Sequence, residues 1–147
     1  MRLGPPLIVG CAMIASMVMV QAMAITAIVR LVRRQVPPAG AVAAWVHNVS
    51  VVTQVLLLIV GAQLVHIASW AALFLGCGEF DAFSTAFYHS AVNFTTLGYG
   101  DILMSPAWRL LGPLEAVAGT LMFGTSTAVL FFVTERLIRL RLDHVAG

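Results

Sequence analysis

The chain has 147 residues, of which 61% are hydrophobic and only 10% are charged. A soluble domain of this composition would expose large apolar patches, so we expect a membrane protein whose solvent is the lipid bilayer. The net charge is +2, and every basic residue is an arginine. This charge is too small and too scattered for a nucleic-acid footprint, and we expect no nucleic-acid partner.

Three segments are apolar over enough residues to cross a bilayer about 30 Å thick as helices. They cover residues 5–29, 55–75 and 110–133. The second should begin earlier, near Ala43, because the residues that follow keep a helical pattern with Trp45 at the expected membrane interface. The first span carries no arginine along its length, so we expect a peripheral packing helix and not a voltage sensor.

The arginines predict the orientation of these spans. Six lie between the first two spans or after the third, and two lie elsewhere. Since cytoplasmic loops are enriched in arginine, we expect a cytoplasmic C-terminus and an outer N-terminus, in the inner membrane of a bacterium. Cys11 and Cys77 then share the outer side, and whether they form a disulfide stays open. An alternative takes residues 1–24 as a cleaved signal peptide, but the apolar run is longer than a usual signal core.

The segment between the second and third spans is too polar and too rich in glycine to be a further crossing. Residues 82–95 are compatible with a short helix, and Asp81 is placed to cap its first amides. The C-terminal end of such a helix carries about half a negative charge, which attracts cations. Gly98 and Gly100 follow, and because both can adopt positive φ, they would let successive carbonyl oxygens turn toward one axis. Irregular backbone at membrane depth is expected only where it lines a path or is buried in protein.

The sequence TTLGYGD, from Thr95 to Asp101, resembles the selectivity-filter signature of potassium channels. The resemblance implies an all-α membrane protein in which each chain has three transmembrane helices, a re-entrant pore helix and a filter loop. Because one chain carries one filter segment, it also implies a homotetrameric pore. The family order divides the chain into an accessory N-terminal span with its linker (1–41) and a pore domain (42–147). Within the pore domain it implies an outer helix at 43–75, a pore helix at 82–95, a filter at 96–100, an inner helix at 108–135 and a short cytoplasmic tail at 136–147.

By this resemblance the protein would conduct K⁺ passively and would not be an enzyme; K⁺ is the permeant ion, and no cofactor is implied. The backbone carbonyls of Thr96, Leu97, Gly98 and Tyr99 and the Thr96 hydroxyl would replace the hydration shell of the ion, and Gly100 would complete the filter. No soluble ligand-binding domain is expected in the chain. Two other functions stay open, a cation channel with weak selectivity and a non-conducting membrane subunit. A glycine-rich outer turn without a role in conduction is the remaining structural alternative.

Polar residues near the filter are candidates for supporting it. Tyr88 and His89 stand where the family has paired tryptophans, and we expect one of them to hydrogen-bond Asp101. A bond from His89 would depend on pH because histidine titrates near neutrality, although His89 is as readily a packed rim residue. The other expected supports are Thr95 and Asn93. Leu97 stands where valine or isoleucine is more usual, which should leave the number of carbonyl ligands unchanged.

Glu115 lies about one turn into the third span, and an ionisable group inside a span is a functional candidate. We expect it to brace the filter from behind through a hydrogen bond to Asn93, Ser90 or a filter-side hydroxyl; direct ion binding is the less favoured alternative. The family pattern makes Gly119 a hinge of the inner helix. The spacing of pore-facing residues on the inner helix of this family implies that the conduction path is lined by Thr120, Phe123, Thr127, Phe131 and Glu135. Phe131 would close the path by dewetting if it faces the pore, and would serve packing if it faces lipid.

Overall fold

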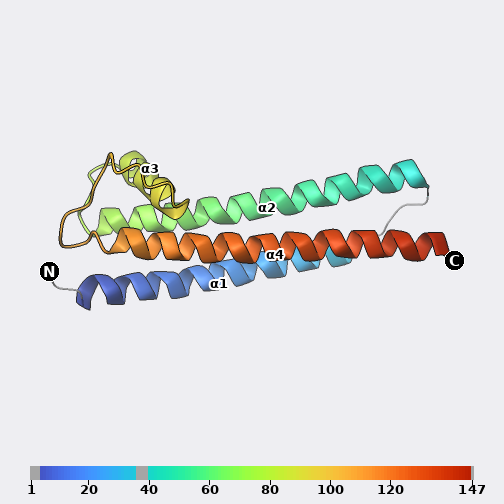
Figure 1. Cartoon of the computed structure of the whole chain (residues 1–147), viewed down its shortest axis with the longest axis horizontal. Coiled ribbons are helices and arrows are strands. Elements are labelled where there is room, and N and C mark those ends of the chain that lie inside the picture. Colours follow the sequence, from blue (N-terminus) through green and yellow to red (C-terminus); the bar gives the residue numbers. More distant parts are fainter. Residues whose placement is uncertain (1–3, 36–39, 147) are drawn as a thin grey trace.

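The computed structural model describes residues 4–35 and 40–146, and within these ranges all regular secondary structure is helical. The helices are α1 (Gly4–Arg34), α2 (Ala41–Gly76), α3 (Phe83–Phe94) and α4 (Leu111–Ala146). The three long helices lie side by side, and the short α3 sits at one end of this bundle, against α2 and α4 (Figure 1). The all-α membrane fold predicted from the sequence is confirmed.

The segments long and apolar enough to cross a membrane are Gly4–Arg34, Val42–Gly76 and Leu111–Arg139. They correspond to the three predicted spans. The helix of the third span continues to Ala146, so the described residues of the predicted cytoplasmic tail are helical and continuous with the span. Glu135 and Arg139, one turn apart on this extension, form an ion pair at 2.5 Å, and such a pair stabilises a helix locally.

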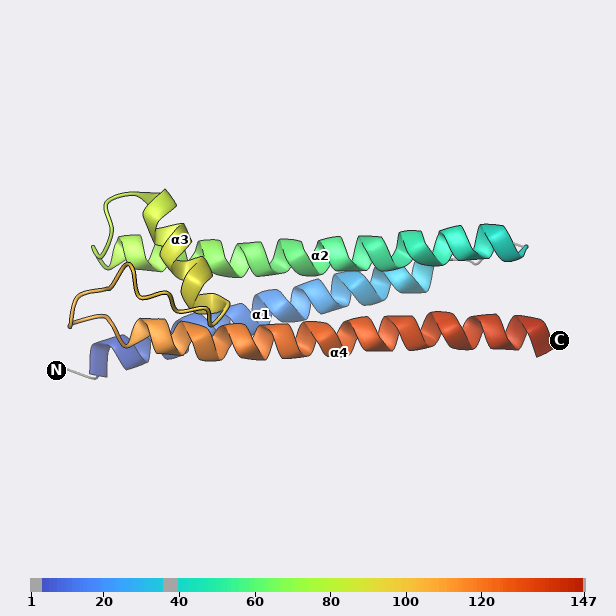
Figure 2. The same cartoon turned by 45° about the horizontal axis from the view of Figure 1, so that its top comes forward.

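The short helix α3 enters the bundle from one end. It runs from the end of α2 toward α4, and the chain after it returns to the same end before α4 begins (Figure 2). The N-cap of α3 is Ala82, and no side chain caps the helix. The predicted cap by Asp81 is therefore wrong, because Asp81 lies one residue before the position from which a side chain caps the first amides.

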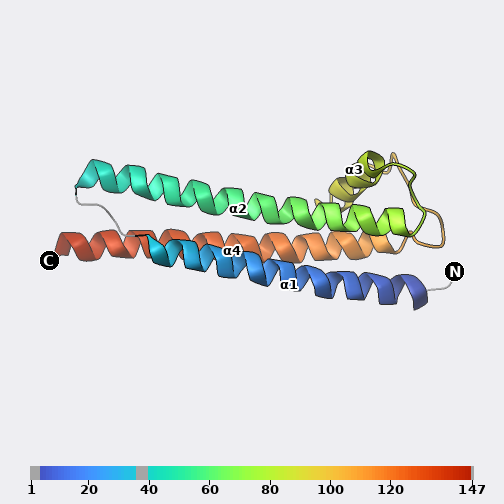
Figure 3. The same cartoon turned by 180° about the vertical axis from the view of Figure 1, so that it is seen from behind.

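The first helix packs lengthwise against α4 and α2 (Figure 3). In the half of the bundle near α3, the buried Met17 contacts Trp70, whose indole Nε1 donates to its sulfur at 2.8 Å. In the opposite half, Ile28 and Val32 join buried valines of α2 and α4 in a second apolar core. α1 therefore packs against the other two long helices and contributes to both cores of the bundle.

The turn after α2 directs the chain toward α3. Gly78 has a φ of 72° and donates its amide to the Leu75 carbonyl at 2.9 Å, which ends the helix in the way glycine commonly does. Cys77 precedes this glycine and is half-buried, whereas Cys11 on α1 is exposed. Both cysteines are free, which answers the question of a disulfide that the sequence left open.

Candidate functional site

The loop after α3 is fixed to the last turn of the helix by backbone hydrogen bonds. The Thr96 amide donates to the Asn93 carbonyl at 2.9 Å, and the amides of Leu97 and Gly98 both donate to the Val92 carbonyl, at 3.0 and 3.2 Å. The N–H and C=O of one trans peptide unit point in opposite directions. The carbonyls of Thr96 and Leu97 are therefore directed away from α3.

The backbone of this loop alternates in handedness. The φ angle is 60° at Thr96, 59° at Gly98 and 71° at Gly100, and it is not positive at Leu97 or Tyr99 between them. In an ordinary extended strand successive carbonyls point to opposite sides. When the sign of φ changes from one residue to the next, successive carbonyls can instead point to the same side. Thr96 is the one non-glycine residue with positive φ in the described part of the chain, a conformation that costs about 1–3 kcal/mol.

The loop is open to its surroundings in the single chain. All residues from 95 to 101 are exposed. Within residues 4–35 and 40–146, no backbone amide donates to the carbonyls of residues 96–100. These carbonyl oxygens are therefore available to a ligand from outside the chain.

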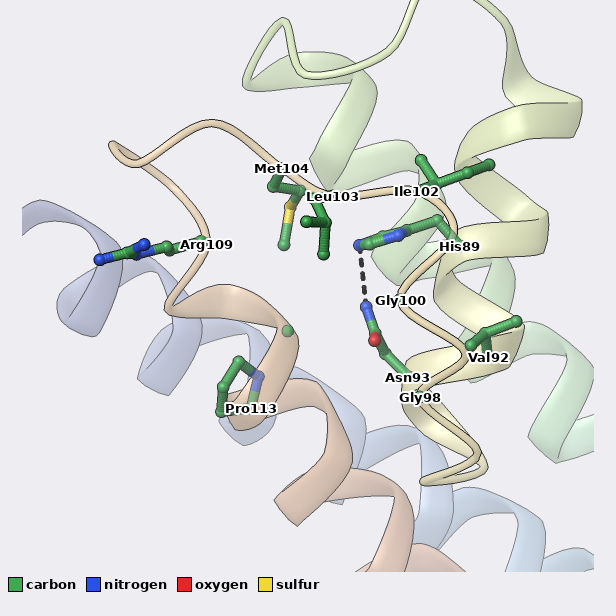
Figure 4. A pocket seen from close by; sticks show the side chains of 11 residues that line it. His89, Val92, Asn93, Gly98, Gly100, Ile102, Leu103, Met104, Arg109 and Pro113 are labelled. Atoms are coloured by element: carbon green, nitrogen blue, oxygen red, sulfur yellow. Dashed lines mark hydrogen bonds between the residues drawn. The ribbon is translucent and has the colours of Figure 1, made fainter.

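Tyr88, and not His89, makes the predicted hydrogen bond to Asp101. Tyr88 Oη donates to Asp101 Oδ2 at 2.7 Å, and this bond raises the pKa of the phenol and keeps it a donor. His89 is buried and turned toward Asn93, whose Nδ2 lies 2.8 Å from its Nε2 (Figure 4). Burial lowers the pKa of His89, against the opposing effect of a nearby backbone carbonyl and carboxylates. The neutral ring accepts the Asn93 bond, so the tether of Asp101 does not depend on the titration of His89.

A cavity of about 320 Å³ lies behind the loop (Figure 4). Gly98, Gly100 and Asn93 line it on one side, and Arg109 and Pro113 line it near the start of α4. A Cβ at either glycine would meet no atom within 4 Å. Glycine therefore serves at these two positions to allow positive φ, and not to leave space for a neighbouring side chain.

Glu115 reaches from α4 to α3. It is fully buried, and its Oε1 lies 2.5 Å from Ser90 Oγ. The same Ser90 Oγ lies 2.8 Å from the Ile67 carbonyl of α2. The predicted hydrogen bond to Ser90 is thus present, and it connects three helices. Asn93, another predicted partner, lies close to the carboxyl group, but Oε2 reaches hydrogen-bond geometry with no residue that the structure describes.

A second acid, Glu79, holds the far end of the loop. Its two carboxylate oxygens accept hydrogen bonds from the Ser105 amide and the Ser105 hydroxyl, both at 2.6 Å. The chain after the loop is thereby fixed to the turn that follows α2. This pair was not predicted from the sequence, because no local pattern relates two residues so far apart in the chain.

Gly119 allows α4 to approach the last turn of α3. A Cβ at this position would overlap the Phe94 carbonyl oxygen and would lie 2.9 Å from the carbonyl carbon. The Phe94 ring is itself buried between His66 and Phe123, with ring centroids 6.0 and 5.5 Å away. α4 is helical without interruption through Gly119, so the role of this glycine as a hinge stays a prediction.

The predicted pore-facing residues lie along α4. Those exposed in the single chain are Thr120, Phe123, Thr127 and Phe131, while Glu135 is half-buried. The hydroxyls of both threonines donate to carbonyls of their own helix, four residues earlier. That these residues line a conduction path stays a prediction.

A polar cluster in the bundle joins all three long helices and was not identified from the sequence. Gln21 of α1 donates to Ser126 at 3.0 Å and to Thr125 at 3.1 Å, both on α4. Gln63 of α2 donates to the same Ser126 at 2.9 Å, and His66 Nε2 lies 3.2 Å from Gln21 Oε1. The signal in the sequence was the presence of two glutamines inside apolar spans, where polar side chains commonly bond to neighbouring helices.

A comparison with known families defines the class of protein. Residues 54–136 match the family described as Ion channel. This match covers more than half of the chain, and the chain belongs to this ion channel family. The matched residues begin within α2, end within α4 and include α3 and its loop, whereas α1 lies outside them. No curated protein and no solved structure matches the chain. With its three long apolar helices, the protein is an integral membrane protein.

Proposed function

We propose that the protein is a potassium-selective channel that conducts K⁺ passively as a homotetramer. The observation that carries the proposal is the alternation of φ at Thr96, Gly98 and Gly100. It lets the carbonyls of consecutive residues face one side, and a column of such oxygens replaces the water around a dehydrated ion. A glycine-rich turn without a role in conduction would need neither this alternation nor a strained threonine.

We propose four copies because a potassium-channel filter is built from four such loops and a single chain supplies one. A ring of carbonyls around an ion requires the same loop to be repeated about an axis. The loop is exposed in the single chain, and so are Thr127 and Phe131 on α4. This exposure is expected of residues that face the axis or a neighbouring copy in the tetramer. An apolar side chain such as Phe131 at the axis would also allow closure by dewetting.

The end of α3 adds a potential that favours cations. The C-terminal end of a helix carries about half a negative charge, and in this chain that end leads directly into the loop.

In the proposed orientation the loop faces outward. Arginines at the ends of α1 and α4 then lie at the cytoplasmic end of the bundle: Arg30, Arg33, Arg34, Arg136 and Arg139.

Flux measurements in liposomes test this function. With opposed K⁺ and Na⁺ gradients across the membrane, we expect K⁺ flux with little Na⁺ flux. Gly98→Ala should abolish the K⁺ flux and leave assembly intact, because a Cβ opposes the φ of 59°. Gly78→Ala is the matched control: its φ is 72° and its Cβ also meets nothing within 4 Å, so it carries the same strain of about 1–2 kcal/mol outside the loop.

Each outcome separates the alternatives. Equal flux of the two ions would identify a weakly selective cation channel, and absence of flux through a well-folded tetramer would identify a non-conducting subunit. Undiminished selective flux in Gly98→Ala would refute the assignment of the filter. Equal loss of flux in Gly78→Ala would show that backbone strain anywhere, and not the loop, is responsible.

A further inference from the structure

A buried serine behind the loop has two oxygen neighbours and a single proton. Ser90 Oγ lies 2.8 Å from the Ile67 carbonyl oxygen and 2.5 Å from Glu115 Oε1. A hydroxyl group has one hydrogen to donate and two lone pairs with which to accept. Ser90 is therefore a donor to one of these oxygens and cannot be a donor to both.

The Ile67 carbonyl must receive the serine proton, because it has no hydrogen of its own. If Ser90 donated to Glu115 instead, two oxygen atoms would face each other at 2.8 Å with no proton between them, which is repulsive. The proton between Ser90 and Glu115 then has to come from the carboxyl group. We propose that Glu115 is a neutral carboxylic acid that donates to Ser90, and that it is a positioning residue for α3 and the filter loop.

The surroundings of Glu115 fit a neutral acid. Its side chain is fully buried inside an apolar span, and its Oε2 has no hydrogen-bond partner among the described residues. In the same part of the chain Glu115 forms no ion pair. An ionised carboxylate without a cation is strongly disfavoured in a membrane interior, whereas an unpaired carbonyl oxygen of a neutral acid costs far less.

The titratable groups on the neighbouring helices do not supply a cation to Glu115. On α3, His89 is bonded to the Asn93 amide. On α2, His66 is bonded to the Gln21 amide oxygen. On α1, which packs against α4 through Gly10, the titratable group nearby in sequence is the exposed Cys11.

The proton completes a chain of hydrogen bonds across three helices, from Glu115 on α4 through Ser90 on α3 to Ile67 on α2. Ser90 lies one turn before Phe94, the last residue of α3, so this chain fixes the helix just before the loop begins. Loss of the carboxyl proton would leave Ser90 with an acceptor on both sides. Ser90 could then donate to only one of them, and the chain of hydrogen bonds from α4 to α2 would be broken.

Infrared spectroscopy of the full chain in liposomes tests the protonation state directly. At neutral pH we expect the carbonyl stretching band of a protonated carboxylic acid, which disappears in Glu115→Gln and shifts in Ser90→Ala. The other described acids are exposed or half-buried, and a band that Glu115→Gln removes belongs to Glu115. A spectrum that is the same in the wild type and in Glu115→Gln would overturn the proposal. This measurement does not depend on conduction, so its failure is distinguishable from failure of the proposed function.

The positioning role rests on the proposed channel function and is tested by flux. In Glu115→Gln the amide N–H replaces the acid as donor to Ser90, so K⁺ flux should stay within about twofold of the wild type, whereas Glu115→Leu, which has no donor, should lose about tenfold. Wild-type flux in Glu115→Leu would overturn the positioning role. Equal loss in Glu115→Gln and Glu115→Leu would overturn it as well, because a donor would then not be what matters.

Discussion

Replacing Gly119 with alanine would push α4 away from the last turn of α3. The added Cβ would overlap the Phe94 carbonyl oxygen, and it would lie 2.9 Å from the carbonyl carbon and 3.2 Å from the Cα atom of Phe94. These are backbone atoms, so rotation of a side chain cannot relieve the overlap. One of the two helices has to move.

The size of the effect follows from these distances. Carbon atoms pack at about 3.5–4.0 Å, so the contact at 2.9 Å requires a separation of about 0.6–1.1 Å. Overpacking of this kind costs about 1–3 kcal/mol, while alanine recovers about 1 kcal/mol of helix propensity relative to glycine. We expect a net loss of about 0–2 kcal/mol in the free energy of unfolding.

Conduction should respond more strongly than stability. Thr96 follows Phe94 by two residues, and its strained backbone is bonded to the turn that has to move. Gly119→Ala should therefore reduce K⁺ flux in liposomes several-fold while the tetramer persists. Gly124→Ala, on the same helix, gains the same propensity, and its Cβ meets nothing within 4 Å. It should keep wild-type flux.

Wild-type flux together with wild-type thermal stability in Gly119→Ala would refute the argument from close contact. Loss of flux in both variants would indicate that bending of α4, and not its contact with Phe94, is what the glycines provide. Loss in Gly119→Ala alone, with a lower melting temperature, supports the contact.

Three further predictions concern other contacts. Tyr88→Phe removes the bond to Asp101 and should lower the selectivity for K⁺ over Na⁺ in the liposome assay; unchanged selectivity would show that the tether is dispensable. Gln21→Leu leaves His66 and Ser126 without this partner and should lower the free energy of unfolding by about 1–3 kcal/mol, which a lower melting temperature in detergent would show. Gln54→Leu is the control, because the bond from Gln54 to Ser50 is exposed, and it should change the melting temperature little. Cys77 should react with a membrane-impermeant thiol reagent in intact cells, and reaction only in opened membranes would reverse the proposed orientation. The reaction should become faster as the pH rises, because burial and the charge of Glu79 raise the pKa of this thiol.

Features that depend on local composition follow from the sequence. The three spans are readable as unbroken apolar runs, because the bilayer requires them. Positive φ at Gly98 and Gly100 was also predicted, since a residue without Cβ adopts it at little cost. Positive φ at Thr96 was not predicted from the residues, because threonine disfavours it and only the surrounding contacts hold it there.

Features that depend on contacts between distant segments were largely missed. The bonds of Glu79 to Ser105 and of Gln21 to Ser126 join residues whose proximity only the folded chain reveals. Asp81 failed as a cap because α3 begins one residue later than predicted, which places Ala82 at the N-cap. Two adjacent helical residues such as Tyr88 and His89 point to different sides of the helix, so sequence alone left open which of them binds Asp101.

The strain at Thr96 explains why several contacts converge on the end of α3. A threonine with a φ of 60° costs about 1–3 kcal/mol and persists only where its neighbours determine the backbone. Before Thr96, the helix is held through Ser90, and the Thr96 amide is bonded to Asn93; after it, Asp101 is bonded to Tyr88. If either support were lost, relaxation of Thr96 to negative φ would turn its carbonyl away from the common side. The column of oxygens that we propose as the basis of selectivity would therefore exist only while the loop is held at both ends.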